Sequence, residues 1–205
     1  MRIFVLGATG GTGTALIEQA LERGHDVMAL VRSPHKLGAR PKLAVVEGDP
    51  RSAAALEKSL PGSDVVISAL GPPIPPLRRT TILGDAAQAT VTAMVATGVR
   101  RVLAISGELQ HREPGAMVTI LRATLLRRLA RDQAELERVV GASPLDWTIA
   151  RPTRLTRGAL TRAYRTEVDG PPARPRPISR ADVAHFLLDA AERGAYIRQA
   201  VGLAT

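Results

Sequence analysis

The 205-residue sequence contains no cysteine and few aromatic side chains: one Trp, two Tyr and two Phe. The lack of cysteine excludes disulfides, thiolate nucleophiles and thiolate metal sites. The four histidines are scattered without metal-ligand spacing, so no metal centre is expected. No apolar run approaches the roughly 18 residues of a membrane span. The apolar run after Met1-Arg2 is too short for a signal peptide, which favours a cytoplasmic protein with no membrane partner.

The net charge is +9, and all but three of the 28 basic side chains are arginine. Such a charge favours anionic ligands such as phosphorylated cofactors. Proteins that bind single-stranded nucleic acid place stacking aromatics in a basic groove. The arginines of this chain are not interleaved with aromatics, which disfavours a nucleic-acid partner. A GC-rich genome would produce the same abundance of arginine and alanine, and both explanations stay open.

Glycines are concentrated in the segment GATGGTG, residues 7–13, between an apolar run and a helical pattern. In a strand–turn–helix unit, one glycine makes the tight turn, one admits a pyrophosphate, and one lets helix and strand pack closely. The helix N-terminus then offers free N–H groups to the phosphates. The segment predicts a dinucleotide site, with a purely structural turn as the alternative. The residues expected to contact the cofactor are Gly7, Thr9, Gly10, Gly11, Thr12 and Gly13.

Apolar runs alternate with helical patterns along the whole chain. Strands are expected at residues 3–6, 25–31, 43–46, 65–71, 100–107, 144–152 and 199–203, and helices at 15–23, 52–60, 80–97, 119–141 and 179–193. This order predicts one α/β domain over residues 1–205, a Rossmann-type doubly wound parallel sheet. Ligands of such sheets bind beyond the carboxyl ends of the strands, which places Ala69, Leu70 and Gly71 beside the cofactor.

Arg32 ends the second expected strand, nineteen positions after Gly13. Sites selective for NAD carry an acidic residue at about this distance, where it binds the ribose 2′-OH. A guanidinium instead suits a 2′-phosphate, to which it donates in fork geometry. Ser33, Lys36 and His35 could add donors. The sequence therefore predicts NADP(H), with a solvated basic turn as the alternative.

Six motifs occur in order along the chain: GATGGTG, LVRSP, EGD, VVISALG, LDWTIARP and ISRADVA. With them the chain resembles the atypical short-chain dehydrogenases/reductases, specifically the NmrA-like and biliverdin/flavin reductase-like NAD(P)H-binding group. The resemblance implies an adenine contact for Asp49, which could equally lie in the N-cap region of the next helix. It also implies an active-site role for Ser106, on the substrate carbonyl or the nicotinamide carboxamide. The backbone of Pro152 and Thr153 would meet the carboxamide, and residues 153–178 would form a small substrate-side lobe with a short strand pair.

The chain departs from the superfamily at the Tyr-x-x-x-Lys pair that supplies the general acid. No tyrosine precedes Tyr164, and Asp132-Gln133 occupies the place of the lysine. This argues against alcohol oxidation, sugar epimerisation and dehydration. His111, in an expected polar loop, could donate a proton near neutral pH, or it could be an idle loop residue.

Two functions remain open. The first is an NADPH-dependent reductase that transfers a hydride to a flavin, quinone or linear tetrapyrrole, which needs little from protein side chains. The second is a non-catalytic NADP(H)-sensing regulator of the NmrA-like type. Residues 151–180 carry eight arginines against two acidic residues, which favours an anionic small-molecule substrate. The sequence does not indicate an oligomeric state.

Overall fold

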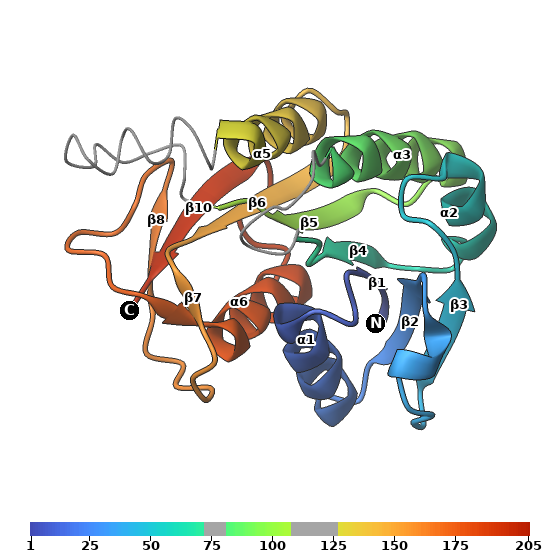
Figure 1. Cartoon of the computed structure of the whole chain (residues 1–205), viewed down its shortest axis with the longest axis horizontal. Coiled ribbons are helices and arrows are strands. Elements are labelled where there is room, and N and C mark those ends of the chain that lie inside the picture. Colours follow the sequence, from blue (N-terminus) through green and yellow to red (C-terminus); the bar gives the residue numbers. More distant parts are fainter. Residues whose placement is uncertain (72–80, 108–126) are drawn as a thin grey trace.

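The computed structural model describes residues 1–71, 81–107 and 127–205 (Figure 1). The expected proline-rich loop at 72–79, the loop with His111 and the first part of the helix expected at 119–141 lie outside these residues. The described elements are β1 (Arg2–Leu6), α1 (Gly11–Glu22), β2 (Asp26–Val31), the 3-10 helix η1 (Pro34–Lys36), β3 (Leu43–Glu47), α2 (Ala53–Ser59), β4 (Val65–Ser68), α3 (Ile82–Thr97), β5 (Arg101–Ile105), α5 (Arg127–Gly141), β6 (Asp146–Pro152), β7 (Leu155–Thr156), β8 (Arg165–Val168), β9 (Ile178–Ser179), α6 (Arg180–Glu192) and β10 (Gln199–Ala204).

The main sheet has the strand order β3-β2-β1-β4-β5-β6-β10-β8. Adjacent strands of this sheet pair in parallel, except that β8 runs antiparallel to β10. The order reverses at β1, which lies between β2 and β4. This arrangement confirms the predicted Rossmann-type α/β fold, and it places the switch point of the sheet at the end of β1, where ligands of such folds bind.

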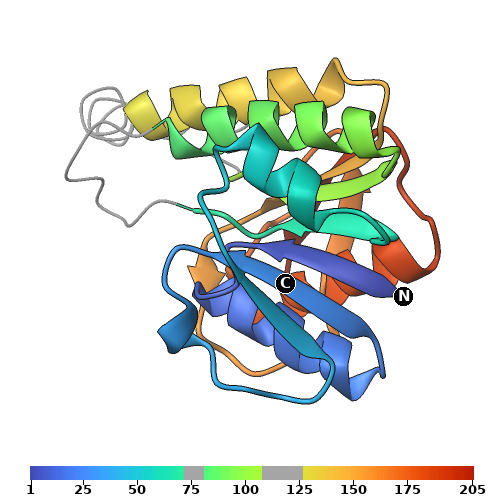
Figure 2. The ribbon, with the colours of Figure 1, turned by 90° about the vertical axis from the view of Figure 1, so that its right-hand side faces the viewer.

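Helices cover both faces of the sheet. In Figure 2, α2, α3 and α5 lie above the sheet, and α1 and α6 lie below it. Successive residues of β1 therefore enter opposite cores: Ile3 and Val5 pack with α1 and α6, whereas Phe4 and Leu6 pack with the other three helices. This two-sided burial explains why the strands read as continuous apolar runs instead of alternating patterns. Among the described residues, no helix has the length and apolar character needed to cross a membrane.

Several helix ends follow the expected chemistry. Ser179 caps α6 by accepting a bond from the Asp182 amide at 2.9 Å, and α3 ends at Gly98 with a positive φ of 75°. The N-cap of α2 is Ser52, whose hydroxyl accepts from the Ala55 amide. Asp49 therefore does not cap this helix.

The lobe expected at 153–178 does contain a short strand pair, β7 with β9. The sequence does not predict a further feature of the lobe: its strand β8 pairs with β10 and so extends the main sheet. Gly202 of β10 permits a close approach there, since a methyl group at this residue would overlap the Gly170 carbonyl. The lobe thus continues the main sheet at one edge.

Asp182 ties the lobe to α6. Its carboxylate is 1% exposed, and it accepts bonds from the amides of Thr161 at 2.8 Å and Arg162 at 2.7 Å. The hydroxyls of Thr161 and Ser179 complete the set. Burial raises the pKa of Asp182, but the four hydrogen bonds outweigh burial and leave that pKa below its ordinary value.

We expect Asp182→Ala to lower the free energy of unfolding by about 2–3 kcal/mol, because buried donors lose a charged acceptor. Since the folded pKa is depressed, this contribution is present above the unfolded pKa and fades as pH falls through the folded value. Urea unfolding at pH 7 and at pH 3 measures the difference from wild type, with the exposed Asp26→Ala as control. A loss at pH 3 as large as that at pH 7 would contradict the assignment.

Candidate functional site

The glycine turn after β1 leaves no room for side chains at two positions. Gly7 has a φ of +79°, and a methyl group there would lie 2.6 Å from the Ala69 carbonyl carbon and 2.7 Å from the Leu70 nitrogen. A methyl group on Gly13 would overlap the Gly7 carbonyl. Strand β1, the end of β4 and helix α1 therefore meet backbone to backbone. This places Ala69 and Leu70 beside the turn; their predicted contact with the cofactor stays a prediction.

Helix α1 presents an open N-terminus at this turn. Gly10 is its N-cap, and no side chain of the described residues caps the helix. Its first turn contains no acidic residue. Thr9, Gly10 and Gly11 are exposed, whereas Thr12 is buried. Unpaired amides together with the positive end of the helix dipole make this surface suitable for an anion such as a phosphate.

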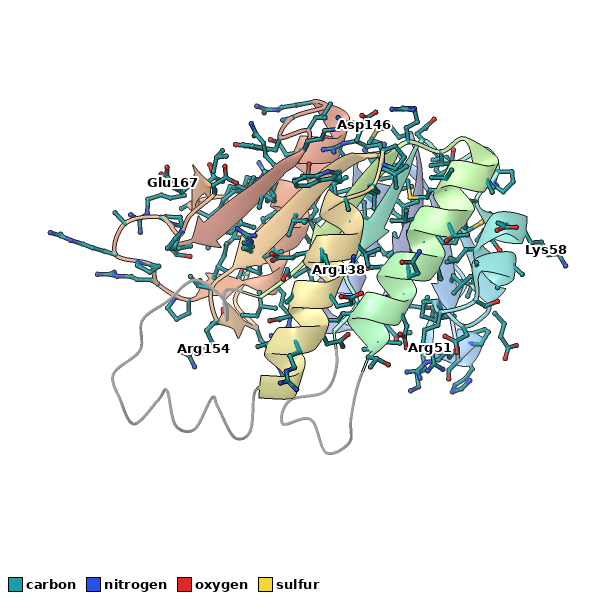
Figure 3. The ribbon with its side chains drawn as sticks, turned by 90° about the horizontal axis from the view of Figure 1, so that it is seen from above. Arg51, Lys58, Arg138, Asp146, Arg154 and Glu167 are labelled. Carbon is teal, nitrogen blue, oxygen red and sulfur yellow. The ribbon has the colours of Figure 1, made fainter. Side chains whose placement is uncertain are left out.

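The ends of β2 and β3 carry opposite charges. Arg32 is exposed, and it forms no hydrogen bond or ion pair within the described parts of the chain. Asp49 accepts the Arg51 amide at 3.0 Å and the Arg51 Nη2 at 2.6 Å. The hydrogen bond from the Arg51 guanidinium is the main reason that the pKa of Asp49 falls to about 2. An adenine contact from Asp49 would share its carboxylate with Arg51, which Figure 3 shows at this edge of the sheet.

A cavity of about 140 Å³ lies between the glycine turn and the segment after β2. Thr9 and Thr14 line it from one side, and Lys36 and Arg40 from the other. Lys36 is one of the donors that the sequence predicts, whereas Arg40 is not. The sequence does carry a signal for Arg40, because Arg32, Lys36 and Arg40 place three cations within nine residues of the short segment after β2. A larger, open hollow of about 420 Å³ lies at the opposite, amino edge of β1–β3 and contains none of the candidate residues.

Two buried polar atoms near the end of β5, one of them from α5, have no partner among the described residues. The Ser106 amide donates to the Ala150 carbonyl at 2.8 Å, but its hydroxyl, on a residue 1% exposed, has no partner among the described residues. The same holds for Oε1 of Gln133 on α5. Gln133 reaches this strand end, since a methyl group on Gly107 would overlap its Nε2. Such orphaned groups require an explanation, and a bound ligand is one.

Asp132, next to Gln133, has a structural partner instead. Its carboxylate accepts the Gly84 amide at 2.8 Å and the Leu83 amide at 3.2 Å, and so binds the first turn of α3. Burial raises the pKa of Asp132, and these two bonds partly offset the shift. A helix-binding carboxylate and a neutral amide therefore stand where the resemblance expects a lysine.

At the end of β6, the donors of Thr153 are already engaged. Its amide donates to the Leu203 carbonyl at 2.9 Å and its hydroxyl to the Arg176 carbonyl at 2.6 Å. The predicted contact between Thr153 and the carboxamide would therefore have to use the backbone carbonyl of Thr153. Pro152 is buried beside it. Arg151 pairs with Glu137 of α5 at 2.7 Å, so this arginine is neutralised within the protein.

The structure gathers the predicted residues along one edge of the sheet. The glycine turn, Ala69 and Leu70 lie at β1 and β4, and Ser106 and Thr153 follow at β5 and β6. Figure 3 marks this edge by Arg51 and Arg154, opposite Asp146. Gly71 is exposed and has open space around it, and His111 lies outside the described residues. Within the described ranges, no three His, Cys, Asp or Glu side chains gather as a metal site.

This fold, with its glycine turn at the switch point, defines a Rossmann-type dinucleotide-binding protein. The chain belongs to the NAD(P)H-binding family, which matches it over residues 7–193. The predicted membership of an NAD(P)H-binding family is thereby confirmed.

Solved structures share the fold over the whole chain. One is a candidate exported protein from Burkholderia pseudomallei, with a TM-score of 0.83, 27% identity and coverage of 100% of both chains. Another is a candidate NADH-flavin reductase from Streptococcus pneumoniae TIGR4, with a TM-score of 0.80, 26% identity and coverage of 100% of this chain and 99% of that one.

A curated relative matches over a shorter stretch. It is a 3-beta-hydroxysteroid dehydrogenase from Mycolicibacterium neoaurum, 37% identical over 65 residues. That stretch is 32% of this chain and 18% of the dehydrogenase. The match therefore leaves most of the dehydrogenase without a counterpart here.

We expect Gly13→Ala to weaken binding of the dinucleotide at least about tenfold and to lower the melting temperature. The added methyl group overlaps the Gly7 carbonyl, and overpacking of this kind costs about 1–3 kcal/mol. Quenching of protein fluorescence by NADPH measures the affinity. The control is Gly141→Ala, where a methyl group meets open space. Wild-type affinity in Gly13→Ala would refute the close packing of this turn.

Proposed function

We propose that the protein is an NADPH-dependent reductase that passes a hydride to a conjugated acceptor such as a flavin, a quinone or a linear tetrapyrrole. One observation carries the proposal. The proposed nicotinamide end of the edge holds Ser106 and Gln133, neutral groups whose hydroxyl and Oε1 have no hydrogen-bond partner among the described residues, where a carbonyl reductase would need an acid and its lysine. The 26% identity to the candidate NADH-flavin reductase supports the same class.

The chemistry asks little of these side chains. When bound, NADPH would supply a hydride to a ring or bridge atom of the acceptor, whose conjugated system would take up the negative charge. The proton that completes the reduction then comes from water. The Gln133 Oε1 can accept from the carboxamide NH₂, and the Ser106 hydroxyl can donate to its oxygen. The two residues would in this way hold the nicotinamide face toward the acceptor.

Selectivity for NADP(H) rests on the cations around the end of β2. Arg32 is exposed and unpaired within the described segments, so its guanidinium is free to bind a 2′-phosphate. Lys36 and Arg40 lie beside Thr9 in the adjoining cavity, and Arg40 is shared with the Glu18 carboxylate at 3.9 Å. An acidic residue that would bind a ribose 2′-OH is not present at this strand end. We place the 2′-phosphate among these groups.

The acceptor is expected to be anionic. The lobe presents exposed Arg154, Arg157 and Arg162, and Figure 3 shows Arg154 at the same edge of the sheet as the site. A phosphorylated or carboxylated acceptor such as FMN or biliverdin would be attracted there.

The second candidate function is an NADP(H)-sensing regulator. The lack of the Tyr-x-x-x-Lys acid–base pair favours this function as well.

We expect Arg32→Glu to weaken NADPH binding about a hundredfold and to leave NADH binding unchanged or improved, because a carboxylate repels the 2′-phosphate but can accept a ribose hydroxyl. Titration of cofactor fluorescence yields both dissociation constants. Lys58→Glu, a matched charge reversal on α2, should change neither. Tighter NADH than NADPH binding by the wild type would rule out the assignment.

Turnover separates the enzyme from the sensor. We expect NADPH oxidation with FMN, menadione or biliverdin, and about a tenfold lower kcat in Ser106→Ala, since one hydrogen bond that orients the nicotinamide is lost. Stopped-flow absorbance at the NADPH band measures the rate. Micromolar NADPH binding without turnover of any of the three acceptors would favour the sensor.

A further inference from the structure

Arg180, the first residue of α6, lies against the glycine turn although 169 residues separate it from Gly11. A methyl group on Gly11 would lie 2.7 Å from the Arg180 Cδ and 3.1 Å from its Nε. Gly11 is the first residue of α1. The guanidinium of Arg180 is therefore held beside the N-terminus whose amides are suited to a phosphate.

The charge of Arg180 is not balanced within the described residues. Its Nη1 donates to the Thr156 carbonyl at 3.1 Å, and it forms no ion pair there. The nearest carboxylate in sequence, Asp182, is already committed to four donors from the lobe and from Ser179. A guanidinium has five N–H donors, so most of those of Arg180 remain available.

Two positive features thus lie side by side, a half-buried guanidinium and the positive end of the α1 dipole. Their mutual repulsion is unfavourable, and the first turn of α1 supplies no acidic residue to relieve it. An anion placed between them removes the repulsion and gains charge-assisted hydrogen bonds from both. The anion of matching chemistry at this turn is the diphosphate of a dinucleotide.

We propose that Arg180 binds the cofactor diphosphate from the side of α6, and that Gly11 lacks a side chain to make room for it. This inference rests on the proposed NADPH function and adds a residue from the C-terminal third of the chain to that site. Arg180 and Arg32 then bind different phosphate groups of the cofactor: Arg180 binds the diphosphate, and Arg32 binds the 2′-phosphate.

Two ligands test this division, NADPH and adenosine 2′-monophosphate, which lacks the diphosphate. Arg180→Gln should weaken NADPH binding about tenfold and leave binding of adenosine 2′-monophosphate unchanged. Arg32→Glu should weaken both. Arg193→Gln, at the far end of α6, is the matched control and should change neither. Isothermal titration measures the affinity of the wild type and of the three variants for both ligands, and the melting temperature without ligand checks that each variant is folded.

A double-mutant cycle provides a second measurement should Arg180→Gln be poorly folded. Gly11→Ala pushes the Arg180 side chain aside and should weaken NADPH binding in the wild-type background. In an Arg180→Lys background the methyl group meets a thinner side chain, so its effect should be at least about threefold smaller.

Unchanged NADPH affinity in Arg180→Gln, with wild-type binding intact, overturns the inference and leaves the proposed function standing. So does an equal loss of adenosine 2′-monophosphate binding, because the effect would then not be on the diphosphate. A wild-type protein that binds no NADPH overturns both the inference and the proposed function.

Discussion

The structure depends on a backbone-to-backbone contact at the switch point of the sheet. The Gly7 carbonyl occupies the space that a side chain on Gly13 would need, and the backbone of Ala69 and Leu70 occupies the space beside Gly7. This contact sets how closely α1 approaches β1 and β4, and so where the helix N-terminus lies. Because the core on either side is built from alternate residues of the same strands, a shift at this turn would disturb both cores.

The two halves of the functional edge differ in chemistry. At the adenosine end, cations and open amides provide charge for phosphates. At the proposed nicotinamide end, the described side chains are a hydroxyl and an amide without partners in the described part of the chain, and a carboxylate that binds α3. Under the proposed function, this edge would hold the cofactor through charge and would supply little means of moving protons. Such a combination suits an acceptor whose own electrons stabilise the added hydride.

Features that depend on neighbours in sequence could be predicted. The turn follows from glycine spacing, the cap of α6 from Ser179 and Asp182, and the end of α3 from Gly98. At Asp49, the sequence leaves two alternatives open, an adenine contact and a place in the N-cap region of α2. The structure gives the cap to Ser52, and Arg51 holds the Asp49 carboxylate. The choice depends on side-chain rotamers, which sequence patterns do not contain.

Features that depend on distant neighbours could not be predicted. Strand β8 has only one strongly apolar residue, Val168, and joins the sheet because the edge of β10 is available. The orphaned atoms of Ser106 and Gln133 become apparent only when β5 and α5 are packed together. The sequence predicts that the Gly11 backbone binds phosphate. It does not predict that the Arg180 side chain of α6 fills the space beside Gly11.

The first turn of α6 has a consequence for how the lobe and the glycine turn depend on each other. It holds the lobe through Asp182 and reaches the glycine turn through Arg180, two residues apart. Because both contacts arise within one helical turn, the lobe and the glycine turn share a single support. A substitution that displaces the start of α6 would therefore disturb both of them together.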